Sequence, residues 1–147
     1  MPRDVEYGRE LARMISAEFN GRIDSIEFTY DAYLELDQLV AGQSYCRVSP
    51  NSYSQVRESR TDWRDEATLV LSLVSVAGPT DKSSWIDDWL DGWDQMQRTM
   101  RDFELFSDRN RKISSIDADE RYDTTLFHTN KRLFTQASIQ FSNLLEV

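Results

Sequence analysis

The sequence predicts a single α+β domain, in which a mostly antiparallel sheet is flanked on one face by an N-terminal helix and a long central helix. Three observations predict this fold. Apolar residues recur at helical spacing near the N-terminus and over residues 80–106. Several other segments alternate or concentrate apolar residues over strand lengths. The chain has 147 residues, an ordinary length for one domain.

The N-terminal helix is expected over residues 4–19. Asp4 suits the N-cap, and Asn20-Gly21 is a helix stop signal. Charged residues occupy the opposite face, so this helix should pack on a core. The apolar positions that define the inner face are Val5, Leu11, Ile15 and Phe19.

Three strands are expected in the first half of the chain. Residues 23–30 alternate apolar and polar side chains, as a half-buried strand does. Residues 45–48 form a short strand that Ser49-Pro50 ends. Residues 68–76 are apolar on both faces, which is typical of a central strand.

Residues at about 50–66 are polar, without a clean period and with few apolar anchors. We therefore expect a mobile loop or an extended arm there, and long loops in compact domains usually carry function.

The longest helix is expected over residues 80–106. Its apolar stripe consists of unusually large side chains. Burying each aromatic ring contributes on the order of 2–3 kcal/mol to the stability of the fold. A short strand at 112–116, a turn at 117–119 and a long strand from Leu133 to Phe141 follow. The stripe consists of Trp85, Trp89, Trp93, Met96, Met100 and Phe103.

Composition excludes several classes of protein. Seventeen Lys and Arg against 26 Asp and Glu give a net charge of -9, which argues against a general nucleic-acid binder. One cysteine and one histidine argue against disulfide frameworks, zinc sites and histidine relays, so no cofactor or metal is expected. No secretory signal or membrane-length apolar run is visible, which predicts a cytoplasm-like compartment.

Few candidate catalytic or metal-binding groups emerge. The acidic residues Asp87, Asp88, Asp91 and Asp94 lack an accompanying histidine and are best interpreted as a solvated helix face. Residues 117–123 resemble a calcium loop but lack its glycine. Cys46 has no base nearby in sequence, and His128 lies in a polar turn. We therefore expect no catalytic residues.

The segment from Arg57 to Asp65 is the strongest candidate for a binding surface. It alternates charges and contains one tryptophan, and Arg and Trp are enriched at interface hot spots. Its arginines suit ion pairs between subunits. A solvated loop remains the alternative interpretation. The candidate oligomer-interface residues are Arg57, Arg60, Trp63 and Arg64.

The order of these elements resembles the tail-terminator or tail-completion proteins of long-tailed bacteriophages, and related minor tail and neck components. The resemblance rests on the element order, on the apolar pair Leu36 and Leu39 behind the first strand, and on two short motifs. These motifs are Arg47-Val48-Ser49-Pro50 and Ser59-Arg60. The heavy tryptophan stripe departs from the family pattern.

The resemblance implies a structural virion protein and no enzyme. Such proteins form a ring, commonly a hexamer, that caps the tail tube, stops its polymerisation and joins tail to head. The implied partners are further copies of the chain, the tail-tube protein, a neck or head-completion protein, and genomic DNA that passes the lumen without specific binding. No membrane is involved, and assembly would take place in the host cytoplasm.

Two other functions stay open at the level of sequence. One is an acidic adaptor, or an inhibitor that mimics DNA and binds a basic partner. The other is a small hydrolase with buried carboxylates, for which the sequence offers no ligand set.

Overall fold

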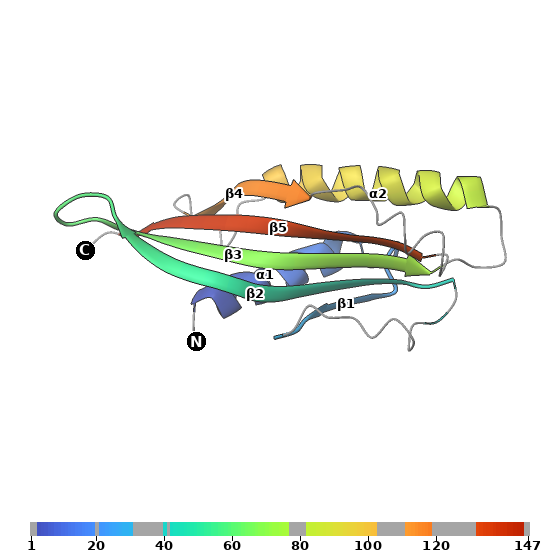
Figure 1. Cartoon of the computed structure of the whole chain (residues 1–147), viewed down its shortest axis with the longest axis horizontal. Helices are drawn as coiled ribbons and strands as arrows, with labels where there is room; N and C mark the ends of the chain where they lie inside the picture. The colour runs from blue at the N-terminus through green and yellow to red at the C-terminus, as the bar shows by residue number, and fades with distance from the viewer. Residues whose placement is uncertain are drawn as a thin grey trace.

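The computed structural model describes residues 3–19, 21–30, 40, 42–76, 82–102, 111–118 and 132–145. It confirms the predicted α+β fold, in which two helices accompany one five-stranded sheet (Figure 1). In chain order the elements are α1 (Arg3–Phe19), β1 (Ser25–Phe28), β2 (Ser44–Arg57), β3 (Trp63–Val76), α2 (Lys82–Asp102), β4 (Arg111–Ala118) and β5 (Arg132–Leu145).

The sheet has the strand order β1-β2-β3-β5-β4, and β3 lies at its centre. Only the short β1–β2 pair is parallel, and the other three pairs are antiparallel. Strands β2, β3 and β5 each contain 14 residues, so they run nearly the full length of the molecule (Figure 1).

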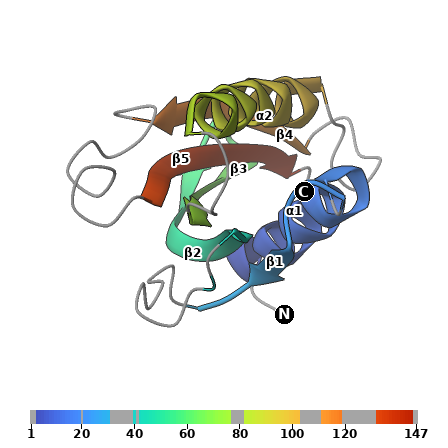
Figure 2. The same cartoon turned by 90° about the vertical axis from the view of Figure 1, so that its right-hand side faces the viewer.

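The core lies between the sheet and the two helices, both of which cover the same face (Figure 2). On β3 the side chains at alternate positions, Leu69, Leu71 and Leu73, join this core. The predicted tryptophan stripe of α2 is confirmed as core packing at Trp89 and Trp93. Phe103, also expected in the stripe, lies outside the described residues.

The loop interpretation of residues 50–66 is wrong, whereas the alternative of an extended arm agrees with a hairpin that projects from the body (Figure 1). Residues 50–57 continue β2, residues 63–66 begin β3, and the two stretches pair with each other from Ser52↔Thr68 to Arg57↔Trp63. The alternating pattern was missing because this part of the hairpin extends past the core. Most of its side chains are exposed, with Asp65 as the buried exception, so no apolar period is required.

Three smaller differences concern element boundaries. β1 is shorter than the predicted strand at 23–30. The predicted turn at 117–119 is wrong in part, because Asp117 and Ala118 pair with β5 as the last residues of β4. The expected end of the central helix, residues 103–106, lies outside the described residues.

The reactivity of the single cysteine gives a direct test of the burial of β2. Cys46 is completely buried on β2, and burial raises the pKa of its thiol to about 12. We expect a disulfide reagent at pH 8 to leave the native protein unmodified and to label one thiol per chain in denaturant. Rapid labelling of the native protein would contradict this placement of β2.

Candidate functional site

The most prominent surface feature is the far end of the β2–β3 hairpin, residues 50–66, which we call the distal hairpin. It projects past the helices at one end of the molecule (Figure 1). Every residue from 51 to 61 is exposed. This segment therefore adds little to the core, and its conformation needs another explanation.

The turn of the distal hairpin is held by its own hydrogen bonds. The backbone N–H groups of Glu58 and Ser59 donate to the carbonyl of Asp62 at 2.9 and 3.2 Å. The Arg57 guanidinium donates to the carbonyls of Ser59 and Arg60, both at 3.0 Å. These bonds give the tip a defined shape in the absence of a core.

The structure brings the four predicted interface residues together at this tip. Arg57 and Trp63 are register partners, and the guanidinium lies 5.8 Å from the ring centroid. Arg64 pairs with Glu58 at 3.3 Å. Arg60 is exposed, and its guanidinium forms no hydrogen bond or ion pair with the described residues. Arg57 and Arg64 therefore stabilise the tip, whereas Arg60 is available to a partner.

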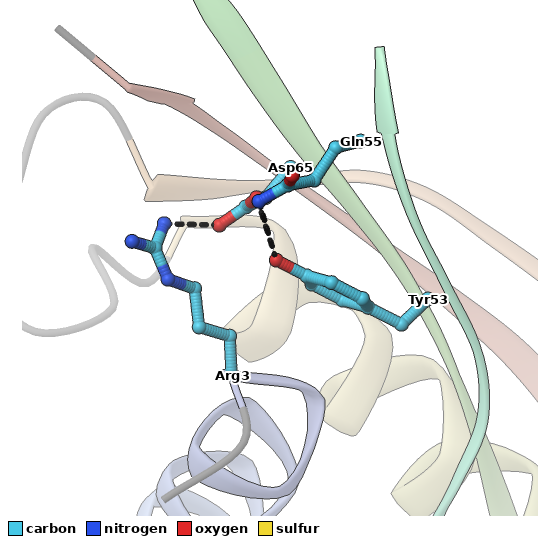
Figure 3. A network of polar contacts seen from close by, with 4 residues as sticks. All are labelled: Arg3, Tyr53, Gln55 and Asp65. Atoms are coloured by element: carbon cyan, nitrogen blue, oxygen red, sulfur yellow. Dashed lines mark hydrogen bonds and ion pairs between the residues drawn. The ribbon is translucent and has the colours of Figure 1, made fainter. Parts of the chain in front are cut away.

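A polar cluster centred on the buried carboxylate of Asp65 anchors the distal hairpin to α1 (Figure 3). The Asp65 carboxylate, which is 0% exposed, accepts hydrogen bonds from the Tyr53 hydroxyl at 2.7 Å and the Gln55 amide at 3.1 Å. It also forms an ion pair with Arg3 at the start of α1. Burial, together with the hydrogen bond to Asp65, raises the pKa of Tyr53.

Sequence reasoning missed this anchor, although a signal existed. Asp65 has the same parity as the buried residues Ala67 and Leu69. Continuing the strand pattern two residues towards the N-terminus would have placed this carboxylate on the core face.

The outer edge of the distal hairpin is open. β1 pairs with β2 only as far as Val48, whose carbonyl accepts the Thr29 N–H at 2.8 Å. Pro50, the next residue facing that edge, has no N–H to continue the ladder. The Glu58 N–H donates to the Asp62 carbonyl and so faces β3. Backbone groups alternate in direction along a strand, so those of Tyr53, Gln55 and Arg57 face away from β3, towards the open edge. No described strand pairs with them.

A cleft of about 410 Å³ lies at the opposite end of the molecule, between the end of α1, the start of β2 and α2. Two carboxylates, Asp24 and Asp88, contribute to its walls. Arg22 also lines it and contacts Gln95 and, at 3.8 Å, Asp91. Its apolar walls come from Phe19, Ile23, Leu73, Trp85, Trp89, Trp93 and Met96.

The remaining sequence candidates show no catalytic arrangement. Asp87, Asp88 and Asp91 are exposed, and Asp94 is half-buried. Among the described residues, no three His, Cys, Asp or Glu side chains group as a metal site would require. The raised pKa of the buried Cys46 keeps its thiol protonated. His128 and residues 119–123 lie outside the described part of the chain.

Comparison with known proteins identifies no relative. No protein-family model matches the chain, and a search of curated proteins finds no match. Neither described helix is long and apolar enough to cross a membrane. Any functional conclusion therefore depends on the residues of the chain itself.

Proposed function

We propose that this chain is a structural assembly protein of a phage tail. It forms a ring, most simply a hexamer, that caps the tail tube, stops tube polymerisation and provides the surface that joins the tail to the head. The distal hairpin carries the proposal, because it is a hydrogen-bonded and anchored extension whose outer edge pairs with no described strand.

An open strand edge favours association with another polypeptide. Proteins usually protect such edges with charged residues or by covering them, since unpaired backbone groups recruit further strands. Pro50 and the β-bulge beside it protect the start of this edge, but residues 51–56 contain no charged residue and no proline. Three large apolar side chains are also exposed on the hairpin: Tyr53 at 40%, Val56 at 41% and Trp63 at 39%. This combination is typical of a surface that a partner covers.

The charge of the chain is compatible with a channel that DNA crosses. A net charge of -9 repels phosphate groups, so DNA would pass the lumen without specific binding. The proposed partners are further copies of the chain, the tail-tube protein and a neck or head-completion protein, and the proposed location is the virion. No catalytic role is proposed.

The first test is the mass of the purified chain in solution. Six chains of 17.2 kDa make about 103 kDa, which sedimentation equilibrium distinguishes clearly from a monomer. Phage particles assembled without this protein should then carry abnormally long tails. A monomer at high concentration that fails to bind tail tubes and instead binds a basic protein would support the adaptor function and contradict the ring.

Trp63 gives a sharper test of the hairpin as the interface. We expect Trp63→Ala to weaken self-association at least tenfold, about 1.4 kcal/mol, because exposed tryptophans dominate interface energies. Far-UV circular dichroism should not change, since the side chain lies outside the core. An unchanged association constant would remove the hairpin from the interface.

A further inference from the structure

We infer that the cleft between α1, β2 and α2 receives Arg60 from the hairpin tip of a neighbouring copy of this chain. The inference rests on the proposed ring and names the contact that joins one subunit to the next. It begins from two features of the described chain: Asp88, an exposed cleft carboxylate that pairs with no described cation, and Arg60, an exposed arginine at a hydrogen-bonded tip.

The cleft has the chemistry that recognises a guanidinium. Trp85 and Trp89 contribute aromatic walls, and the Trp85 indole N–H donates to Ser75 at 2.8 Å, which fixes that ring. Asp88 lines the cleft and is exposed, and no cation in the described part of the chain pairs with it. Arginine binds both aromatic faces and carboxylates, the latter through two parallel hydrogen bonds.

The charge around the cleft is not neutralised internally. Arg22 is the one described cation in its lining, and it contacts Asp91 and Gln95. Asp24 and Asp88 line the same space, and Asp87 lies next to them on the exposed face of α2. Of the two lining carboxylates, Asp24 accepts hydrogen bonds from Ser44, so Asp88 remains for an incoming cation, with Asp87 beside it outside the cleft.

The hairpin tip complements this charge. Between residues 51 and 64 basic residues outnumber acidic ones by three to two, whereas Asp65 and Glu66 lie farther from the tip and the whole chain carries -9. The carbonyl of Arg60 accepts a hydrogen bond from Arg57, so the backbone is held while the Arg60 side chain points into solvent. A continuous exposed stretch of an acidic molecule, residues 51–61, therefore presents an arginine.

The cleft and the hairpin tip are too far apart to meet within one molecule, so a contact between them must join two copies of the chain. The cleft lies beside Ser44, where β2 begins, and the tip follows Arg57, where β2 ends (Figure 1). A strand of 14 residues spans about 45 Å at roughly 3.3 Å per residue. The contact therefore joins opposite ends of two molecules. Such head-to-tail contacts close into a ring when the rotation between subunits permits it.

Charge-reversal variants test the contact. Arg60→Glu and Asp88→Arg should each weaken self-association at least tenfold in sedimentation experiments. Mixing the two variants should restore assembly. The reversed tip of the Arg60→Glu variant can then bind the reversed cleft of the Asp88→Arg variant, and the remaining native tip and native cleft can bind each other. The matched control is Arg98→Glu, which makes the same charge change at an exposed position of α2 outside the cleft. This control should assemble normally.

The outcomes separate this contact from the proposed function. If wild-type chains form rings and Arg60→Glu assembles as well as Arg98→Glu, the cleft contact is wrong and the ring stands. If the single variants fail and their mixture does not recover, Arg60 and Asp88 do not meet. A monomeric wild-type protein would contradict the ring itself. A monomer that binds a foreign basic polypeptide through Asp88 would assign the cleft to that partner.

Discussion

Replacing Trp93 with alanine is expected to lower the free energy of unfolding by about 3–5 kcal/mol. Trp93 is 1% exposed and belongs to the cluster that joins α2 to α1 and the sheet. Alanine would remove the contacts of the indole ring and leave a cavity in the core. Neighbouring core residues of α1 and the sheet would have to move to fill it. Because domains of this size have about 5–15 kcal/mol of stability, this one substitution should lower the melting temperature by on the order of 10 °C.

Trp63→Ala is the matched control for this substitution. It deletes the same side chain from a position that is 39% exposed at the hairpin tip. Urea unfolding followed by circular dichroism should show a change within about 0.5 kcal/mol for this variant. Equal losses for the two variants would contradict the packing of α2 on the sheet. The pair also separates the roles of the two residues, since only Trp63 is expected to affect self-association.

Replacing Asp65 with asparagine should release the distal hairpin from the body of the protein. The buried carboxylate accepts hydrogen bonds from Tyr53 and Gln55 and pairs with Arg3. Asparagine retains the shape of the side chain but loses its charge. Its amide NH₂ group would face the donors of Tyr53, Gln55 and Arg3 and could not accept a hydrogen bond from them. Leaving buried polar groups unpaired in this way costs about 1–3 kcal/mol. Hydrogen exchange at the amides of residues 63–67 should accelerate accordingly.

Glu66→Gln provides the control for Asp65→Asn. It removes the same charge from the adjacent residue, which lies on the opposite face of β3 and is exposed. We expect its exchange rates and unfolding free energy to match those of the wild-type protein. If Asp65→Asn behaves in the same way, the polar cluster does not anchor the hairpin. If Asp65→Asn unfolds the whole protein, the hairpin and the core form one cooperative unit.

The elements that face the core could be predicted from sequence because burial imposes a period. The helical spacing of Leu11, Ile15 and Phe19 identified α1, and the tryptophan stripe identified α2. The alternation from Leu133 to Phe141 identified β5. In each case one face of the element is buried away from water. Apolar side chains therefore recur about every 3.6 residues along a helix and every two residues along a strand.

The distal hairpin could not be predicted in this way. Ser52, Ser54 and Val56 meet water on one side, and the opposite face has lost most of its helix cover. Its strand conformation comes from pairing with β3, whose partner residues lie six to sixteen positions away in sequence. The role of Arg57, Arg60, Trp63 and Arg64 as an interface remains a prediction.

By itself the sequence determined the fold class, the helix faces and the central strand, because the hydrophobic effect acts on each side chain according to its local period. Only the tertiary structure decided the sheet register, the burial of Asp65 beside Arg3, and the cleft between α1 and α2. Each of these brings together residues from separate elements, and no local pattern specifies which distant surfaces will face one another across the core.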